Sequence, residues 1–349
     1  MFIPLRDNNA HIKELCTRLN LGKPREGLSN VPGGFHHRVW RLETERGTFA
    51  VKQLAPDTDI NDEKVVKHYN VSEAIASKFA ECGLSTVSAL SRDGKFLQVI
   101  DAGAYLVYPW KDAVALDDGE VSAHHALAVA ELLAKMHSAD IEVPGVEPEL
   151  GEPSSEDDVD EMVRIAVKSR LKIAPLLSER RALLMRIARQ YHKALPLLER
   201  HQIISHGDLD QNNVLWDSDD SPIIIDWEAA HKINPTHEVI TVALEWSGIT
   251  ADFDQALYSR FVAAYISAGG TIARDLLEAA HHCVLGKWLD WLMYNIGRLV
   301  NLQNPKQRTL GEEQVEFTLP VMVKLDKLVP SLLQDLAQQA TTPLPAETL

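Results

Sequence analysis

The chain has few cysteines and no long hydrophobic run, and each of these absences excludes certain classes of protein. Its three cysteines, Cys16, Cys82 and Cys283, are odd in number and widely spaced, so they support neither a disulfide framework nor a zinc site. No apolar run approaches the roughly 20 residues that cross a bilayer. Residues 1–8 lack the charged start and apolar core of a secretory signal. We therefore expect a cytoplasmic protein with no membrane partner.

The motifs of two common enzyme classes are also missing. The sequence has no Gly-Lys-Ser/Thr phosphate loop and no His-Glu-x-x-His zinc motif, which excludes the P-loop nucleotide hydrolases and the metalloproteases of that type. The adjacent histidines at 36–37, 124–125 and 281–282 do not form a zinc pattern either. Any nucleotide or metal chemistry must therefore use other side chains.

The net charge of −15 is concentrated in the later part of the chain. Residues 1–108 carry 14 Lys and Arg against 13 Asp and Glu, which leaves 21 against 37 for residues 109–349. A nearly neutral first part is able to hold a polyphosphate, whereas an acidic second part repels nucleic acid and attracts cations. We expect a nucleotide and a small molecule, cationic ones included, as partners, and no nucleic acid. Solubility alone also explains the acidity, and the sequence leaves the oligomeric state open.

The pattern of predicted elements changes near residue 108. Before it, apolar alternation predicts strands at 38–43, 48–54, 86–90, 96–100 and 105–108. A helix is expected from about Asp62 to Glu81, with Asn61 or Asp62 as its cap and Gly83 as its stop. After residue 108, helical spacing predicts helices at about 120–137, 158–200, 236–247, 251–268, 271–301 and 311–338. We predict an α+β, bilobal fold with a small antiparallel β-rich lobe at 1–108 and a larger, mainly helical lobe at 109–349.

A turn between two apolar runs is the most informative segment of the second part. The runs at 214–216 and 223–225 flank residues 217–222, which are all Asp, Ser or Pro. This pattern predicts a β-hairpin. Antiparallel pairing would bring Asn213, just before the first strand, beside Asp226, just after the second.

The open end of that hairpin suits a divalent cation and a catalytic base. An amide oxygen and a carboxylate are ligands for Mg²⁺, which takes its remaining ligands from substrate phosphates and water. Asp208 lies five residues before Asn213, in the loop that leads into the hairpin. We predict Asp208 as the catalytic base and Asn213 and Asp226 as the metal ligands. His206 we expect to orient this loop through hydrogen bonds.

The first part of the chain supplies candidates for holding phosphates. Gly33 and Gly34 precede the first strand pair, where paired glycines let backbone N–H groups approach phosphates, although a plain turn explains them as well. Lys52, in a predicted strand, is a candidate phosphate cation. Glu73 interrupts an apolar stripe of the predicted helix at 62–81. Because a carboxylate on a packing face needs a cationic partner, we expect Glu73 to pair with Lys52.

In this order, the segments resemble the aminoglycoside phosphotransferase and choline-kinase-like family, which has a protein-kinase-like fold. The matching segments are residues 32–34, Ala50-Val51-Lys52, Ser72-Glu73-Ala74, residues 133–137, His206-Gly207-Asp208-Leu209 with Asn213, and Ile224-Ile225-Asp226-Trp227. The resemblance implies Mg²⁺ with ATP or GTP as donor. It also implies a linker at 106–110 in which Tyr108 and Trp110 contact the nucleotide base.

We therefore predict a phosphotransferase that moves the γ-phosphate of a Mg-nucleotide to a hydroxyl of a small molecule, aminoglycoside-like or another metabolite. A kinase of choline, homoserine or a thiosugar is an alternative. A protein kinase is disfavoured because no long activation segment follows Asp226, and a non-catalytic pseudokinase is disfavoured by the complete residue set. Asp210 stands where the family often has His, and Trp227-Glu228 where antibiotic-modifying members have a Gly-containing segment.

Side chains for the acceptor are harder to find. Trp288, Trp291 and Asn295 share a predicted helical face that suits a sugar ring, and Asp290 or Glu245 suits an ammonium group. Core packing explains the same stripe. The acidic tract at 152–161 is either near an acceptor or a solvated helix start.

Overall fold

The computed structural model describes residues 9–31, 37–116, 120–146, 152–300 and 305–339. The chain forms two compact units, which we describe separately. The first unit comprises residues 1–120, 139–147 and 204–231, and the second comprises residues 121–138, 148–203 and 232–349. Within the described ranges, no helix combines the length and hydrophobicity that a membrane span requires.

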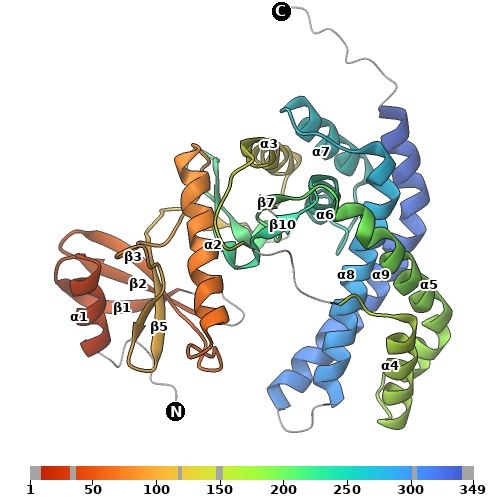
Figure 1. The fold of residues 1–349 in the computed structure, drawn as a ribbon. Coiled ribbons are helices and arrows are strands. Elements are labelled where there is room, and N and C mark those ends of the chain that lie inside the picture. Colours follow the sequence, from red (N-terminus) through yellow and green to blue (C-terminus); the bar gives the residue numbers. More distant parts are fainter. Residues whose placement is uncertain (1–8, 32–36, 117–119, 147–151, 301–304, 340–349) are drawn as a thin grey trace, which may run out of the picture. The chain divides into compact units, whose positions relative to one another are not determined.

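The first unit contains a five-stranded antiparallel sheet with the order β1-β2-β3-β5-β4. Its strands are β1 (Pro24–Val31), β2 (Arg38–Thr44), β3 (Gly47–Gln53), β4 (Gln98–Ile100) and β5 (Gly103–Pro109). Two helices, α1 (Asn9–Arg18) and α2 (Glu63–Glu81), cover opposite faces (Figure 1). Leu15 of α1 packs with Val51 and Val107, whereas Tyr69 of α2 packs with Leu106.

The predicted boundaries of α2 are confirmed. The Asp62 side chain accepts a hydrogen bond from the backbone N–H of Lys64, which caps the first turn. The helix ends at Glu81, and Gly83 follows with a φ of +85°, a backbone conformation that glycine adopts without strain. The glycine after α2 therefore marks where the chain leaves the face of the sheet.

The predicted hairpin forms and is part of the first unit. Strands β8 (Val214–Trp216) and β9 (Pro222–Ile224) pair antiparallel, with Val214 opposite Ile224, and β6 (Val114–Ala115) extends the sheet on the β8 side. A short 3₁₀ helix, η3 (Trp227–Ala229), follows β9.

The Trp227 ring anchors this segment to the rest of the unit. The ring stacks on Phe79 of α2 with centroids 5.1 Å apart, and its Nε1 donates to the Thr86 hydroxyl at 2.8 Å. Trp227 is almost fully buried. The residues that follow the hairpin are therefore held against α2.

Two predictions about strands need correction. Residues 86–90 do not form a strand, because only Thr86 pairs, in an isolated parallel bridge to Ile224. The strand predicted at 96–100 is shorter, since β4 covers only Gln98–Ile100. In the 86–90 segment, side-chain contacts and contacts with the hairpin take the place of regular strand pairing.

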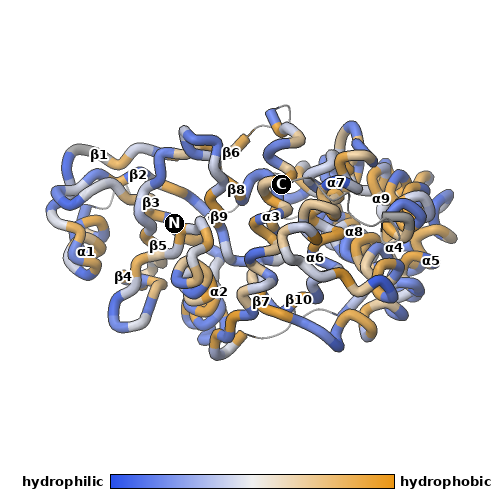
Figure 2. The backbone as a smooth tube through the Cα atoms, turned by 90° about the horizontal axis from the view of Figure 1, so that it is seen from above, coloured by the Kyte–Doolittle hydropathy of each residue, from blue (hydrophilic) through white to orange (hydrophobic). Residues whose placement is uncertain are grey.

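The second unit is helical. Its helices are α3 (Ala123–Ala139), α4 (Glu156–Lys168), α5 (Ala174–Leu198), α6 (Pro235–Trp246), α7 (Gln255–Ser267), α8 (Leu277–Val300) and α9 (Pro305–Gln339). Helices α5 and α9 both pack against α8, and α4 packs against α5 (Figure 1). Hydrophobic residues recur along α3, α6 and α8 (Figure 2), and these supply much of the buried core. Strands β7 (Ile203–Ser205) and β10 (His231–Ile233) lie where the chain changes unit.

The long helix predicted at 158–200 is in fact two helices. Arg170, between α4 and α5, has a φ of +53°, which ends the first helix without a glycine in the sequence to signal it. Helix α4 begins with a capping box between Ser155 and Asp158. The acidic tract is thus explained locally as a helix start.

The first unit extends beyond the predicted lobe boundary at residue 108. Residues 204–231 belong to it because the hairpin bonds to the 85–87 segment and η3 packs on α2. Lobes at 1–108 and 109–349 remain a prediction.

Candidate active site

The loop before the hairpin is held by a buried histidine. His206 has no exposed surface, and its Nε2 donates to the carbonyl oxygen of Ile225 at 2.9 Å. Its Nδ1 accepts the backbone N–H of Asp208 at 3.3 Å. Gly207 has a φ of +78°, and a Cβ there would lie 2.5 Å from the Ala229 carbonyl oxygen. The histidine therefore orients the loop, as predicted.

Asp208 projects from this loop beside Asn213. The Asn213 Nδ2 donates to the Asp208 backbone oxygen at 2.7 Å and to its Oδ2 at 3.1 Å. Asp210 caps the short 3₁₀ helix η2 (Gln211–Asn213) by accepting from two backbone N–H groups. The protein around the Asp208 carboxyl limits its hydration and, with the Asp210 charge, raises its pKa to about 6. A carboxylate with this pKa suits a general base near neutral pH.

Asn213 and Asp226 lie at the same end of the hairpin, as the pattern predicted. The backbone N–H of Ile225 donates to the Asn213 carbonyl oxygen at 3.0 Å, so the two flanking residues are close in space. Asp226 has left-handed backbone angles, φ 59° and ψ 68°, which are strained for a residue other than glycine. This conformation turns its carboxylate out of the strand direction.

The donor atoms at this hairpin end fit a hard divalent cation. Nδ2 of Asn213 is used by Asp208, so within the described part of the chain the amide oxygen keeps its capacity for a ligand. Asp226 accepts a hydrogen bond from Lys52 through Oδ1, so among the described residues its Oδ2 keeps its capacity for a ligand. An amide and a carboxylate oxygen are ligands that Mg²⁺ prefers. Among the described residues, no cluster of three His, Cys, Asp or Glu side chains forms a metal centre by itself.

Lys52 joins the sheet to the segment after the hairpin. It lies in β3 and is 8% exposed. Its Nζ is 2.9 Å from Asp226 Oδ1 and 2.5 Å from Glu228 Oε1. Burial alone would lower the pKa of Lys52, but the two carboxylates outweigh burial and raise that pKa above its ordinary value. The ammonium group therefore stays charged.

Glu228 is a site residue that the sequence analysis did not identify. Besides Lys52, it contacts His37, whose Nε2 is 3.3 Å from Glu228 Oε2. His37 is fixed in turn by the backbone N–H of Ala55, which donates to Nδ1 at 2.9 Å, and by the Tyr69 hydroxyl at 3.2 Å. Burial would raise the pKa of Glu228, but the His37 hydrogen bond and the Lys52 charge hold it at about 2. The only signal in the sequence was its place two residues after Asp226.

The expected ion pair between Lys52 and Glu73 is not formed. Glu73 is 2% exposed, and its Oε1 accepts from the Tyr108 hydroxyl at 2.6 Å while Oε2 accepts from the Ala89 backbone N–H at 2.7 Å. Burial raises the pKa of Glu73 to about 7, against the lowering effect of these two hydrogen bonds. The buried carboxylate therefore accepts hydrogen bonds from neutral donors and does not form the predicted ion pair.

The other residues predicted to contact the nucleotide make the following side-chain contacts. Tyr108 directs its hydroxyl to Glu73. Trp110 donates from Nε1 to Asp112 at 2.9 Å, and the Arg41 guanidinium lies 5.3 Å from its ring centroid. Gly33 and Gly34 lie outside the described residues. The structure thus brings Lys52, Asp208, Asn213 and Asp226 into one unit.

The stripe proposed for an acceptor is split in the second unit. Asn295 is fully buried, whereas Trp291 is 41% exposed and stacks on Tyr294 with centroids 5.6 Å apart. Asp290 accepts from both the backbone N–H and the hydroxyl of Ser154, so its carboxylate anchors the segment before α4. Core packing therefore explains part of this stripe, and the exposed aromatic pair remains.

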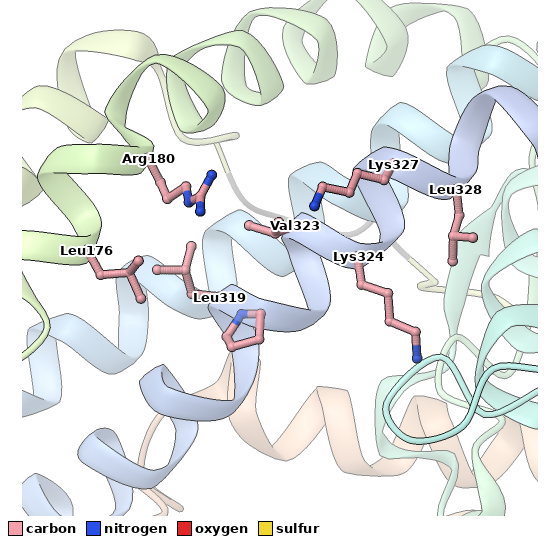
Figure 3. A pocket seen from close by; sticks show the side chains of 8 residues that line it. Leu176, Arg180, Leu319, Val323, Lys324, Lys327 and Leu328 are labelled. Atoms are coloured by element: carbon pink, nitrogen blue, oxygen red, sulfur yellow. The ribbon is translucent and has the colours of Figure 1, made fainter.

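A pocket of about 530 Å³ lies elsewhere in the second unit, between α5 and α9. Leu176, Leu319 and Val323 line it, and the nitrogens of Arg180 and Lys327 point toward each other across it (Figure 3). None of the predicted site residues lines this pocket.

A buried sheet lysine paired with the aspartate after a hairpin, with a second aspartate and an asparagine before that hairpin, is the arrangement of a kinase-like phosphotransferase. A family model described as the phosphotransferase enzyme family matches residues 27–279. The chain belongs to this family, which confirms the resemblance seen in its motifs.

Solved structures agree with the fold. A spectinomycin phosphotransferase in complex with ADP and spectinomycin is 13% identical, with a TM-score of 0.67 over 91% of this chain and 98% of that chain. An aminoglycoside phosphotransferase from Alicyclobacillus acidocaldarius is 14% identical, with a TM-score of 0.62 over 97% of each chain. A choline/ethanolamine kinase family protein from Mesorhizobium loti is 16% identical, with a TM-score of 0.59 over 93% and 99%. These likenesses confirm the protein-kinase-like fold. A search of curated proteins found no match.

Proposed function

We propose that this chain transfers the γ-phosphoryl group of a magnesium-bound nucleotide, ATP or GTP, to a hydroxyl group of a small molecule. The observation that carries the proposal is the contact between Lys52 Nζ and Asp226 Oδ1 at 2.9 Å, in the same unit as the Asp208–Asn213 pair. One cation and three metal- or proton-binding groups are the parts that phosphoryl transfer needs, because this reaction depends on positioning and charge neutralisation.

Each residue has a distinct part in this mechanism. Asp208 accepts the proton of the acceptor hydroxyl while the hydroxyl oxygen bonds to the γ-phosphorus and the bond to the β-phosphate oxygen breaks. Lys52 binds phosphate oxygens and neutralises their charge. Asn213 and Asp226 would hold an Mg²⁺ ion, and the ion would supply further charge neutralisation. The raised pKa of Asp208, about 6, leaves it mostly ionised at pH 7 and able to take a proton.

The acceptor we propose is a small hydroxyl compound, and the acidity of residues 109–349 favours cationic ones. The structural neighbours include proteins described as a spectinomycin phosphotransferase and a choline/ethanolamine kinase family protein. Both names refer to nitrogen-containing acceptors, which supports the same class here. A cytoplasmic location follows from the proposed donor, since that is where the nucleotide is supplied.

The base is tested by Asp208→Asn, which keeps the shape of the side chain and removes its capacity to accept the proton. We expect transfer to fall by about 10²–10⁴-fold, with nucleotide affinity unchanged within about threefold. Asp219→Asn, in the exposed turn of the same hairpin, is the matched control. Unchanged transfer by Asp208→Asn would remove this residue from the mechanism.

The acceptor class is tested by a coupled nucleotide-consumption screen with ATP and GTP across aminoglycosides, choline-like amines, sugars and amino acids. We expect consumption that depends on Mg²⁺ and on an added amine-bearing alcohol. Magnesium-dependent nucleotide binding without transfer to any acceptor would instead support the pseudokinase alternative.

A further inference from the structure

The pocket between α5 and α9 in the second unit, which we call the α5–α9 pocket, has apolar walls. Leu176 of α5 lies on one wall, and Leu319 and Val323 of α9 lie on the other (Figure 3). Leu319 and Val323 are four residues apart, so they share one face of α9. The volume of about 530 Å³ is in the range of roughly 300–1,000 Å³ that is typical of small-molecule sites. The pocket therefore has room for a ligand with an apolar body.

Two cationic side chains face each other across the α5–α9 pocket. The nitrogens of Arg180 and Lys327 point toward each other, with Val323 between them (Figure 3). Arg180 lies one helical turn after Leu176 on α5, and Lys327 lies one turn after Val323 on α9. Each wall thus has an apolar part followed by a positive charge. Because like charges repel, an anion bound between them would be stabilised.

Neighbouring carboxylates leave much of this positive charge uncompensated. Asp326, next to Lys327, accepts from the Arg186 guanidinium through its two oxygens at 3.0 and 2.8 Å. Glu179 is 3.1 Å from Nη2 of Arg180, but its side chain is 63% exposed, so solvent weakens this pair. The carboxylates that the structure describes form no ion pair with Lys327. This positive charge stands out in a part of the chain with 21 basic and 37 acidic residues.

A third cation at the pocket, Lys324, is already used by the protein. Its Nζ donates to the carbonyl oxygens of Ile249 at 3.0 Å and Ala251 at 2.6 Å, in the segment after α6. The charge available to a ligand therefore comes from Arg180 and Lys327. The planar guanidinium of an arginine matches the two oxygens of a carboxylate, which favours this anion over a spherical one.

We propose that the α5–α9 pocket is a binding site for an amphipathic carboxylate of medium chain length. The carboxylate group lies between Arg180 and Lys327, and the aliphatic chain lies against the apolar walls. This ligand class differs from the cationic acceptors proposed above, which the same two charges repel. The competing explanation is that the two long side chains only cover apolar surface with their stems, and it predicts no preference for an anion.

Decanoate, used well below the concentration at which it forms micelles, tests the proposal by isothermal titration calorimetry on the full chain. We expect one molecule to bind per chain. Complete burial of a methylene group strengthens binding roughly fourfold. Because Pro320 and Lys327 are exposed at the pocket, we expect about threefold per methylene, so octanoate should bind about tenfold more weakly than decanoate. Decyltrimethylammonium, with the same chain and a cationic head, should not bind.

Substitutions locate the site. Arg180→Gln and Lys327→Gln should each weaken decanoate binding about fivefold, because each removes one charged donor to the carboxylate. Val323→Glu places a negative charge on the wall between the two cations and should abolish binding. Lys193→Gln, which removes an exposed cation of α5 outside the pocket, is the matched control and should change affinity less than twofold. Unchanged thermal unfolding midpoints would show that the variants are folded.

Three results would overturn the proposal. The first is equal affinity for decanoate and decyltrimethylammonium, and the second is native affinity in both Arg180→Gln and Lys327→Gln. The third is absent decanoate binding together with a dimer that Val323→Glu converts to a monomer in size-exclusion chromatography, which would assign the pocket to an interface between copies of the chain. None of these results bears on the proposed phosphotransfer, because neither cation has a part in that mechanism.

Discussion

Polar side chains have different kinds of partners in the two units. In the first unit, one ammonium group lies between two partly exposed carboxylates, while the buried carboxylate of Glu73 accepts its hydrogen bonds from neutral donors. In the second unit, the His137 ring is fully used: Nδ1 contacts the Tyr265 hydroxyl at 2.7 Å and Nε2 contacts Glu238 at 2.8 Å. The first arrangement has two carboxylates for one ammonium group, whereas in the second each ring nitrogen of one histidine has its own partner.

The difference indicates what each set of residues is for. His137, Glu238 and Tyr265 come from α3, α6 and α7, so their hydrogen bonds tie three helices together. Such a set is expected to support stability, because a buried polar group that loses its partner is costly. Around Lys52, the two carboxylates leave negative charge that a bound cation would balance. Substitutions in the first set should therefore cost activity, and those in the second should cost stability.

Of the substitutions that compare the two sets, Lys52→Met should have the largest effect, because it removes the cation of the first set. We expect transfer to fall by about 10²–10³-fold, the loss seen when one group that stabilises transition-state charge is removed. The midpoint of thermal unfolding should fall less than for Glu238→Ala, since Asp226 is partly exposed and Glu228 keeps its contact with His37. Steady-state kinetics with an acceptor from the screen measures the loss of transfer, and thermal denaturation measures the change in the unfolding midpoint. A large loss of stability with modest loss of transfer would contradict the comparison.

The opposite outcome is expected for Glu238→Ala in the second unit. It leaves His137 buried without one of its two partners, and the free energy of unfolding should fall by about 3 kcal/mol. Chemical denaturation measures this, with Glu131→Ala, exposed on the same helix as His137, as the control. Nucleotide affinity measured well below the unfolding temperature should stay within about twofold. A selective loss of nucleotide binding would show that this set belongs to the site.

The sequence predicted the hairpin end well and the lysine partner badly, for a physical reason. Two apolar runs around a turn determine which residues become neighbours, so Asn213 and Asp226 were predicted together. The N–H of Ile225, the residue before Asp226, donates to the Asn213 carbonyl oxygen. Alternation in β3 indicated the face on which Lys52 lies. It could not show whether a donor from β5 would reach Glu73 first, because that depends on the length of the Tyr108 side chain across the sheet face.

Short irregular turns limited the rest of the prediction. Glu228 reaches Lys52 only because residues 227–229 form one 3₁₀ turn after β9, and three residues carry no periodicity to detect. Arg170 ends α4 with a φ of +53°, where the sequence offers no glycine. Patterns of apolar residues thus predicted long elements and their order, while single turns decided which charged groups meet.

The pH dependence sharpens the comparison for the first unit. Because the pKa of Asp208 is raised to about 6 and a base must be ionised, transfer should fall about tenfold per pH unit below 6 and level off above it. Asp210→Ser keeps a helix-capping hydroxyl and removes the neighbouring charge, so the acidic limb should move to lower pH. Glu73→Gln should leave the limb in place. If Glu73→Gln removed the limb, Glu73 rather than Asp208 would be the group that titrates.

The smallest effect is expected from Trp291→Ala on α8, because this residue belongs to neither set. Its ring is 41% exposed and touches Tyr294, Gln314 and the Arg298 guanidinium, all within the second unit. Losing one exposed aromatic contact should lower the free energy of unfolding by about 0.5–1 kcal/mol. Nucleotide affinity should not change. If KM for an acceptor rises severalfold while that for the nucleotide does not, the exposed aromatic pair is part of acceptor binding. The second unit would then carry specificity as well as stability.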